Sequence, residues 1–269
     1  MKKVTTFLII MFKLIDGFGQ SSNEYYQRGV AKYKANDIQG AIIEFSKSFE
    51  LDPNNYTVIF NRGKLKGQIS DLSGAYSDFT KAIEIDPSQY EAYYMRGYVL
   101  IRSNYPREAL DDFNRAIKLK PDFGDAYYER GNAYSDLKYF KLALSDYTKA
   151  ITYLPNEAII YFNRGIVNDA LLNYHSSIVD YTRAIEIDPM HWQAYSNRGG
   201  AKGYIKDYQG AIVDFNKAIG INPNDAQSYY GRGLAKIFLN QRESGCSDLG
   251  KALKLGNHQA KEAISKYCY

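Results

Sequence analysis

Seven Arg-Gly pairs lie along this chain, and each of their glycines follows the one before it by 34 residues. The glycines are Gly29, Gly63, Gly97, Gly131, Gly165, Gly199 and Gly233. Six of the seven prolines keep the same 34-residue spacing, from Pro53 to Pro223. A fixed period without insertions indicates one small structural unit copied along an axis, not a globular fold around a catalytic pocket. The spacing therefore predicts a repeat protein that acts as a binding scaffold.

The unit at residues 90–123 predicts a pair of helices. In each half, apolar residues recur at three- and four-residue steps, as on one helical face; they are Tyr93, Gly97, Leu100, Ala109, Phe113, Ala116 and Ile117. A turn at 103–106 places Pro106 at the start of the second helix, and Pro121 ends that helix. Glycine inside a helix costs about 1 kcal/mol relative to alanine, so its recurrence indicates a close approach of the second helix.

The pattern around each glycine resembles the tetratricopeptide repeat family from about Ser22 to Gln259. The shared positions are an aromatic residue four places before the glycine, the glycine, a later alanine, a second aromatic residue and the proline. The resemblance implies an all-α fold: a right-handed α-solenoid of seven 34-residue helix-turn-helix repeats over 22–256, with a C-terminal capping helix at 257–269. The repeats would start near residues 22, 56, 90, 124, 158, 192 and 226. Ile59, Ser177 and an irregular last unit depart from the pattern, and a terminal cap is expected to be irregular.

In this family a peptide-binding groove is lined by first-helix residues three places before and one place after each glycine. The resemblance gives these peptide-binding candidates: Tyr26, Phe60, Lys64, Tyr94, Tyr98, Tyr128, Asn132, Phe162 and Tyr230, with Val30, Ile166, Ser196, Gly200 and Leu234 at equivalent positions. Because most are aromatic, a Lys and Asn clamp for a terminal carboxylate is not expected. Acidic residues of the same helices would edge the groove: Glu91, Asp125, Glu129, Asp136 and Asp169.

An aromatic floor with acidic edges suits an extended peptide that carries Lys or Arg, or a Pro-rich one. The alternative is that many of these tyrosines pack between hairpins.

Each repeated arginine is followed 16 residues later by an acidic residue. We expect these to form a structural ladder of ion pairs between packed helices, where the planar arginine fork fits a carboxylate well. The ladder residues are Arg62, Arg96, Arg130 and Arg164 with Asp78, Asp112, Asp146 and Asp180. The alternative is an anion-binding stripe of arginines.

The sequence offers no arrangement typical of catalysis or metal binding. Its three histidines, His175, His191 and His258, fall near turns and share no ligand spacing with Cys or carboxylates. Three glycines between 199 and 203 lie inside one helix, which indicates packing or local flexibility rather than a phosphate loop. We therefore expect no enzymatic activity, no metal and no cofactor.

The two cysteines, Cys246 and Cys268, lie about equally far from a turn near Gly256, on two helices that would be antiparallel. A disulfide between them would pin the cap and needs an oxidising compartment. The alternative is two buried thiols.

Residues 1–19 predict a signal peptide, with Lys2 and Lys3 before an apolar stretch and small residues at Gly17 and Gly19. The apolar stretch is too short to span a bilayer, so no transmembrane segment is expected in the mature chain. The cap sequence also resembles the tails of exported bacterial members of the family. We expect an exported protein, either periplasmic, envelope-associated or secreted; without export it would be cytoplasmic.

The sequence thus predicts a non-enzymatic scaffold or adaptor that binds a peptide or protein partner in an aromatic, partly acidic groove. The alternative is a helical repeat protein that binds single-stranded nucleic acid through tyrosine stacking and arginine–phosphate contacts. The net charge of +4 is too small to favour the second function by itself.

Overall fold

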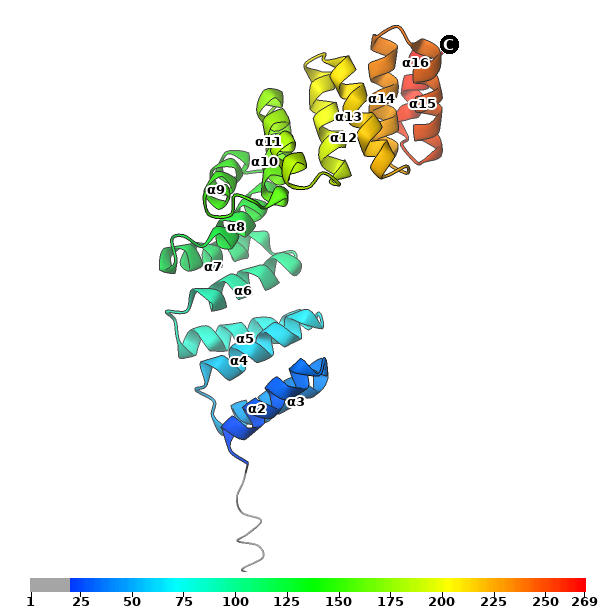
Figure 1. The fold of residues 1–269 in the computed structure, drawn as a ribbon. Coiled ribbons are helices and arrows are strands. Elements are labelled where there is room, and N and C mark those ends of the chain that lie inside the picture. The colour runs from blue at the N-terminus through cyan, green and yellow to red at the C-terminus, as the bar shows by residue number, and fades with distance from the viewer. Residues whose placement is uncertain (1–19) are drawn as a thin grey trace, which may run out of the picture. The chain divides into compact units, whose positions relative to one another are not determined.

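The computed structural model describes residues 20–269, so the predicted signal peptide at 1–19 lies outside the described residues. In the described part, all regular secondary structure is helical and consists of fifteen helices (Figure 1). The chain forms two compact units: unit 1 ends at Pro121, and unit 2 is Asp122–Tyr269. The prediction of an all-α repeat solenoid is confirmed.

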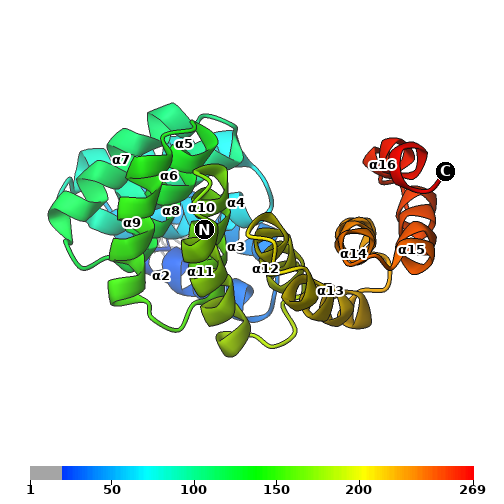
Figure 2. The ribbon, with the colours of Figure 1, turned by 90° about the horizontal axis from the view of Figure 1, so that it is seen from above.

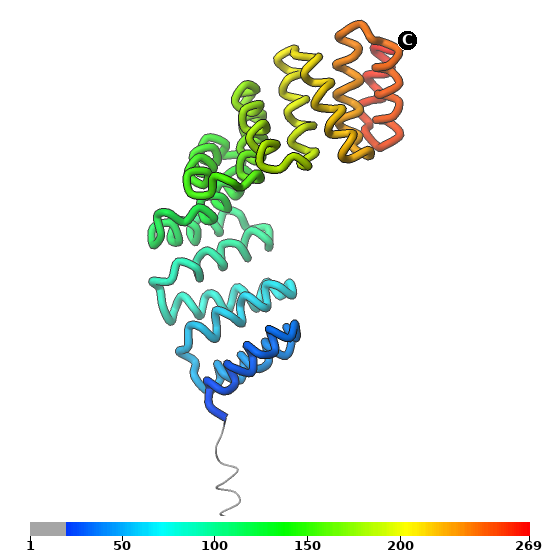
Figure 3. Tube along the Cα trace, viewed as in Figure 1, coloured from blue at the N-terminus to red at the C-terminus, as the bar shows by residue number. Residues whose placement is uncertain are grey.

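Unit 1 consists of helices that pair in chain order into three hairpins, which the tube in Figure 3 follows from turn to turn. The pairs are α2 (Ser22–Lys34) with α3 (Ile38–Leu51), α4 (Tyr56–Gln68) with α5 (Leu72–Ile85), and α6 (Tyr90–Arg102) with α7 (Pro106–Leu119). The second helix of one hairpin also packs on the first helix of the next, as α3 does on α4.

Unit 2 continues the same arrangement with four hairpins. The pairs are α8 (Gly124–Asp136) with α9 (Phe140–Tyr153), α10 (Ala158–Ala170) with α11 (Tyr174–Ile187), α12 (Trp192–Tyr204) with α13 (Tyr208–Ile221), and α14 (Ala226–Phe238) with α15 (Arg242–Lys254). The last helix, α16 (Gln259–Tyr267), packs mainly on α15 and also contacts α14 (Figure 2).

The turn inside each hairpin depends on one residue with left-handed backbone geometry. These residues have φ between 61° and 66° and are Asn36, Ser70, Asn104, Lys138, Leu172, Lys206 and Asn240. Asn tolerates this region better than most residues. In three hairpins an aspartate then caps the second helix; Asp71, for example, accepts a hydrogen bond from the backbone N–H of Gly74.

Six of the seven repeated glycines, Gly29 to Gly199, lie against an aromatic ring of the second helix, whereas Gly233 lies against Gly245 and Leu249. A Cβ atom on Gly165 would lie 2.6 Å from Tyr181, and one on Gly97 would lie 2.9 Å from Phe113. No real Cβ approaches a ring that closely without something shifting. The close approach of the two helices that the sequence predicted is therefore one of glycine to ring.

No helix within residues 20–269 has both the length and the apolar character that crossing a membrane requires.

Candidate binding clefts

The ladder arginines are held by internal ion pairs. The guanidinium of Arg62 donates from Nε and Nη2 to the two carboxylate oxygens of Asp78, both at 2.8 Å. The same paired geometry joins Arg96 to Asp112, Arg130 to Asp146, Arg198 to Asp214 and Arg232 to Asp248. The aspartate side chains in these pairs are at most 9% exposed.

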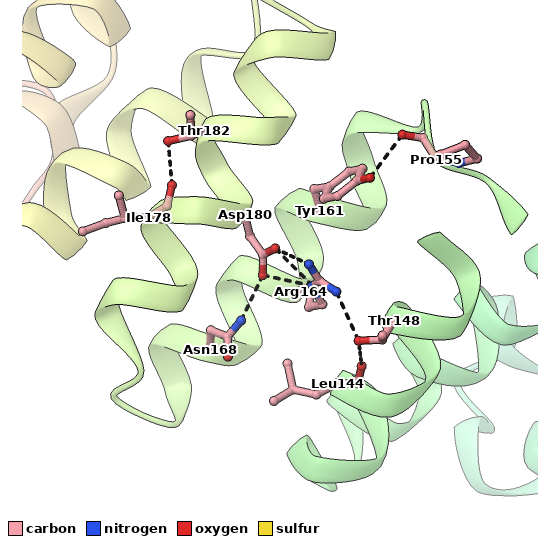
Figure 4. Close-up of polar contacts among 9 residues, drawn as sticks. All are labelled: Leu144, Thr148, Pro155, Tyr161, Arg164, Asn168, Ile178, Asp180 and Thr182. Atoms are coloured by element: carbon pink, nitrogen blue, oxygen red, sulfur yellow. Dashed lines mark hydrogen bonds and ion pairs between the residues drawn. The ribbon is translucent and has the colours of Figure 1, made fainter. Parts of the chain in front are cut away.

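The same arginines also link one hairpin to the previous one within each unit. Figure 4 shows Arg164 between Asp180 of its own hairpin and Thr148 of the hairpin before it. The distance from Arg164 Nη1 to Thr148 Oγ1 is 3.1 Å, and that from Arg62 Nη1 to Ser46 Oγ is also 3.1 Å. With both sides of the fork engaged, these arginines are not available to bind phosphate groups.

The aromatic groove candidates pack with one face on their own hairpin. The ring centroid distances are 5.6 Å for Tyr26–Phe45 and Phe60–Phe79, 6.1 Å for Tyr94–Phe113, 6.2 Å for Tyr128–Tyr147 and 5.8 Å for Phe162–Tyr181. Each of these first-helix rings is half-buried. The packing alternative from the sequence therefore accounts for one face of each ring.

Asn132 and Tyr128 belong to an internal polar network of unit 2. Asn132 Oδ1 accepts hydrogen bonds from Tyr147 Oη at 2.8 Å and from Asn163 Nδ2 at 3.1 Å. Asn163 Nδ2 also lies 3.1 Å from Tyr128 Oη. Asn132 Nδ2 donates to Glu129 at 3.1 Å, so its amide group is already engaged on both sides.

A first cleft, the α4 cleft, lies along α2, α4 and α6 in unit 1 and has a volume of about 400 Å³. Val30, Leu65 and Met95 contribute apolar surface, and Tyr98 contributes an exposed ring. Of the described residues that line it, Lys64 and Arg102 are the charged ones. The charged residues of this cleft are therefore basic, and none of the predicted acidic edge residues lines it.

A second cleft, the α12 cleft, lies along α10, α12 and α14 in unit 2 and has a volume of about 770 Å³. Gly200 and Gly203 lie in its floor, and a Cβ atom on either would meet no other atom within 4 Å. Tyr204, Tyr230, Leu234 and Phe238 are among the residues around them.

Sequence reasoning missed part of this second cleft. The family rule, which takes the residues three places before and one place after each repeated glycine, put Gly200, Leu234 and Tyr230 in the groove. It did not include Gly203, Tyr204 or Phe238. A Cβ atom on Gly199 would lie 3.0 Å from Phe215, so that glycine is needed for packing, whereas Gly203 has open space beside it. The signal in the sequence was the excess of glycines in this one helix over the single glycine that each repeat requires.

The five predicted acidic edge residues divide into different environments. Asp125 and Asp136 are exposed and line neither cleft. Glu91 and Glu129 also lie outside the two clefts, and burial raises the pKa of the Glu129 carboxyl.

Asp169 is the one predicted edge residue that lines a cleft, and it is the only charged residue among the described residues around the α12 cleft. Its Oδ2 accepts a hydrogen bond from Tyr181 Oη at 2.7 Å, its Oδ1 is buried, and the Ser177 hydroxyl is a further hydrogen-bonding neighbour of the carboxyl. Burial raises the pKa of this carboxyl.

Cys246 and Cys268 form a disulfide between α15 and the residue that follows α16. Within residues 20–269, no group of His, Cys, Asp and Glu side chains could hold a metal ion.

Comparisons with known proteins identify the repeat. A TPR repeat model matches residues 107–138, and a tetratricopeptide repeat model matches 124–157 and 193–225. A search of curated proteins finds no match.

Solved structures of similar proteins include YrrB, described as a TPR protein with an unusual peptide-binding site. It is 27% identical, with a TM-score of 0.62, over 68% of this chain and 95% of that chain. MamA is 27% identical, with a TM-score of 0.58, over 60% of this chain and 94% of that chain.

A tetratricopeptide repeat protein from Parabacteroides merdae covers more of the chain. It is 21% identical, with a TM-score of 0.66, over 93% of this chain and 100% of that chain, and at this identity the likeness concerns the fold alone. Together, the seven Arg-Gly registers, the consecutive helical hairpins and these matches show that the chain is a tetratricopeptide repeat protein with multiple repeats.

Proposed function

We propose that the protein is a non-enzymatic scaffold whose first helices bind an extended segment of a peptide or protein. The observation that carries this proposal is the α12 cleft, which opens along the first helices of three successive hairpins. Clefts lined by exposed aromatic rings with a few polar groups suit peptide side chains. The relative YrrB, whose description names a peptide-binding site, supports the same class of ligand.

Binding of single-stranded nucleic acid is the weaker candidate. That function would need the repeated arginines to reach phosphate groups, but they are engaged by buried aspartates. The aromatic rings at the groove positions already pack against rings of their own hairpins, which leaves few rings free to stack on successive bases.

We propose an exported location for the protein. The basic and apolar start of the sequence supports this location, as does the disulfide between Cys246 and Cys268, because disulfides persist in oxidising compartments.

The test is capture of partners from a cell-envelope extract by residues 20–269. One variant carries Tyr98→Ala and Tyr204→Ala, which remove rings that are 36% and 71% exposed in the two clefts. A matched control carries Tyr105→Ala and Tyr139→Ala, two exposed tyrosines that line neither cleft. A partner that is retained by the wild type and the control, but lost from a still-folded cleft variant, would support the proposal.

Equal capture by all three proteins would place binding elsewhere on the molecule. Binding of a single-stranded RNA oligonucleotide that weakens steeply as salt rises would favour the nucleic-acid function instead.

A further inference from the structure

We propose that the α12 cleft selects one Lys or Arg side chain of the bound peptide, with the charged end at Asp169 and the aliphatic stem over the glycine floor. This inference rests on the proposed peptide-binding function and names the side chain that the second unit would recognise. Three observations support it: the open floor, the walls of paired rings and the carboxylate of Asp169, which has no cationic partner among the described residues.

The floor leaves room for a side chain to lie close to the helix backbone. Gly200 and Gly203 are on α12, between α10 and α14, and nothing lies within 4 Å of the position of either missing Cβ. Glycine weakens a helix interior, and at these two positions no packing contact requires it. The open space therefore lies where a ligand can use it.

The walls of the cleft are aromatic and held in place. The Tyr204 ring is 71% exposed and stacks on Tyr174 with a centroid distance of 4.6 Å and an interplanar angle of 9°. The Phe238 ring is 48% exposed and stacks on Tyr208 at 5.0 Å. Rings that are fixed by a neighbour offer apolar surface to the stem of Lys or Arg and a π face to its charge at little entropic cost.

The charge in the cleft is of one sign. Asp169 is the only charged side chain among the described residues that line it; its carboxyl has the Tyr181 and Ser177 hydroxyls as neutral neighbours and forms no ion pair with a described residue. A partly buried carboxylate without a cationic partner is unfavourable, and a cationic side chain in the cleft would compensate its charge, whereas an apolar or acidic side chain would not. The neighbouring polar groups are neutral and suit the peptide backbone; they are Ser196, Asn197, Gln227 and Gln259. The α4 cleft, with Lys64 and Arg102, has the opposite charge.

The test begins with selection from a display library of random peptides on residues 20–269, followed by synthesis of the selected peptides. We expect the selected peptides to share a Lys or Arg position. Replacing that residue by norleucine should weaken binding about tenfold or more, because a charge-assisted hydrogen bond is lost. With Asp169→Asn, the Lys or Arg and norleucine peptides should bind equally well. Glu186→Gln, which removes an exposed acidic charge from α11, is the matched control and should keep the preference.

A second variant tests the floor without risking the fold. Gly203→Leu fills the cleft with a better helix former, so the melting temperature should rise or stay equal while peptide binding is lost. Gly220→Leu is its control, because Gly220 lies in α13, also has open space and lines neither cleft. It should keep binding.

The possible outcomes separate this inference from the proposed function. If peptides bind but show no Lys or Arg preference, the inference is overturned and the scaffold function stands. The inference is also overturned, with the scaffold function intact, if the Asp169→Asn variant keeps the preference for Lys or Arg, or if the Gly203→Leu variant still binds the peptides. If the wild type retains no peptide from the library, both proposals fail.

Discussion

Single residues carry much of the stability of this array, and the ladder aspartates are the main example. Each accepts at least two hydrogen bonds from an arginine of its own hairpin. The arginine also donates to a side chain of the previous hairpin at Ser46, Thr80, Thr148, Thr182 or Asn216. Removing one partner of a buried pair leaves a charge without compensation, which is far more costly than removing an exposed charge.

Replacing a ladder aspartate should therefore destabilise the protein strongly. We expect Asp112→Ala to lower the free energy of unfolding by about 3–5 kcal/mol, because Arg96 loses its carboxylate. Asp111→Ala, at the exposed position beside it on α7, should change that free energy by no more than about 0.5 kcal/mol. Urea titration of both variants measures the difference; similar values would show that the pair is not important for stability.

Leu172 is strained, and relieving the strain should stabilise the fold. It has φ of 61° and is 70% exposed, whereas the equivalent residue in three other turns is asparagine. Leu172→Asn should raise the free energy of unfolding by about 0.5–1 kcal/mol, because asparagine adopts left-handed geometry more easily. Asn104→Leu is the reciprocal change and should lower it. Thermal denaturation of both variants tests this explanation. If both substitutions raised the stability, or both lowered it, the explanation would be contradicted.

Buried tyrosines should make the fold sensitive to alkaline pH. Burial raises the pKa of Tyr181, and its hydrogen bond to Asp169 adds to the effect; burial also raises the pKa of Tyr147. The unfolded phenols lose their proton near pH 10 while the folded ones keep it. This contribution to stability is therefore complete below about pH 10 and is lost as the pH rises further. Denaturant titrations between neutral and alkaline pH measure this effect. The free energy of unfolding should fall less steeply with pH for Tyr181→Phe than for the wild type, whereas Tyr105→Phe should follow the wild type.

At the scale of elements, the hairpin is stabilised by contacts within its own repeat, while the cap depends on a covalent link. Helix α16 contacts α15 and, less extensively, α14, and the Cys246–Cys268 disulfide closes a sequence separation of 22 residues. A short helix with few neighbours is expected to open before the hairpins do.

Reduction should loosen this cap first. A disulfide that closes a loop of this length contributes on the order of 3 kcal/mol. In dithiothreitol, amide hydrogen exchange in α16 should therefore accelerate before exchange in α10 or α12 changes. The Cys246→Ser/Cys268→Ser variant should behave like the reduced protein and show no response to the reductant. Exchange in α16 that is unaffected by reduction would rule out this role.

At the scale of the whole molecule, unit 2 has the parts of a free-standing array. It contains four hairpins, buried clusters around Tyr147, Tyr161 and Phe215, and the capping helix. Repeat arrays need about three or more units and a terminal cap to fold and stay soluble.

Residues 122–269 should consequently fold when expressed alone. We expect helical circular dichroism and a cooperative thermal transition. To separate the helix from the disulfide, Cys246→Ser/Cys268→Ser in 122–269 is compared with Cys246→Ser in 122–256, which lacks α16. The shorter chain should melt at a lower temperature. A non-cooperative transition for 122–269 would mean that this unit needs the rest of the chain.

The sequence by itself determined the repeat, its all-α class and its family. These properties are periodic and local: Gly97 and Phe113, or Arg62 and Asp78, lie 16 residues apart within one hairpin, so their register is visible without the tertiary structure. The tertiary structure decided which side chains are open to a ligand. The Tyr94 ring packs against Phe113 in a tilted arrangement while Tyr98 is exposed, although the same family rule places both in the groove.

Only the three-dimensional arrangement also distinguished Asp169 from the other acidic residues and gave Gly203 a place in a cleft. The physical reason is that the exposure of a side chain depends on neighbouring hairpins, which lie about 34 residues away in the sequence. It also depends on glycines such as Gly203, which leave open space where a side chain would lie. A register can assign a residue to a helical face, but it cannot show how much of that face the next hairpin covers.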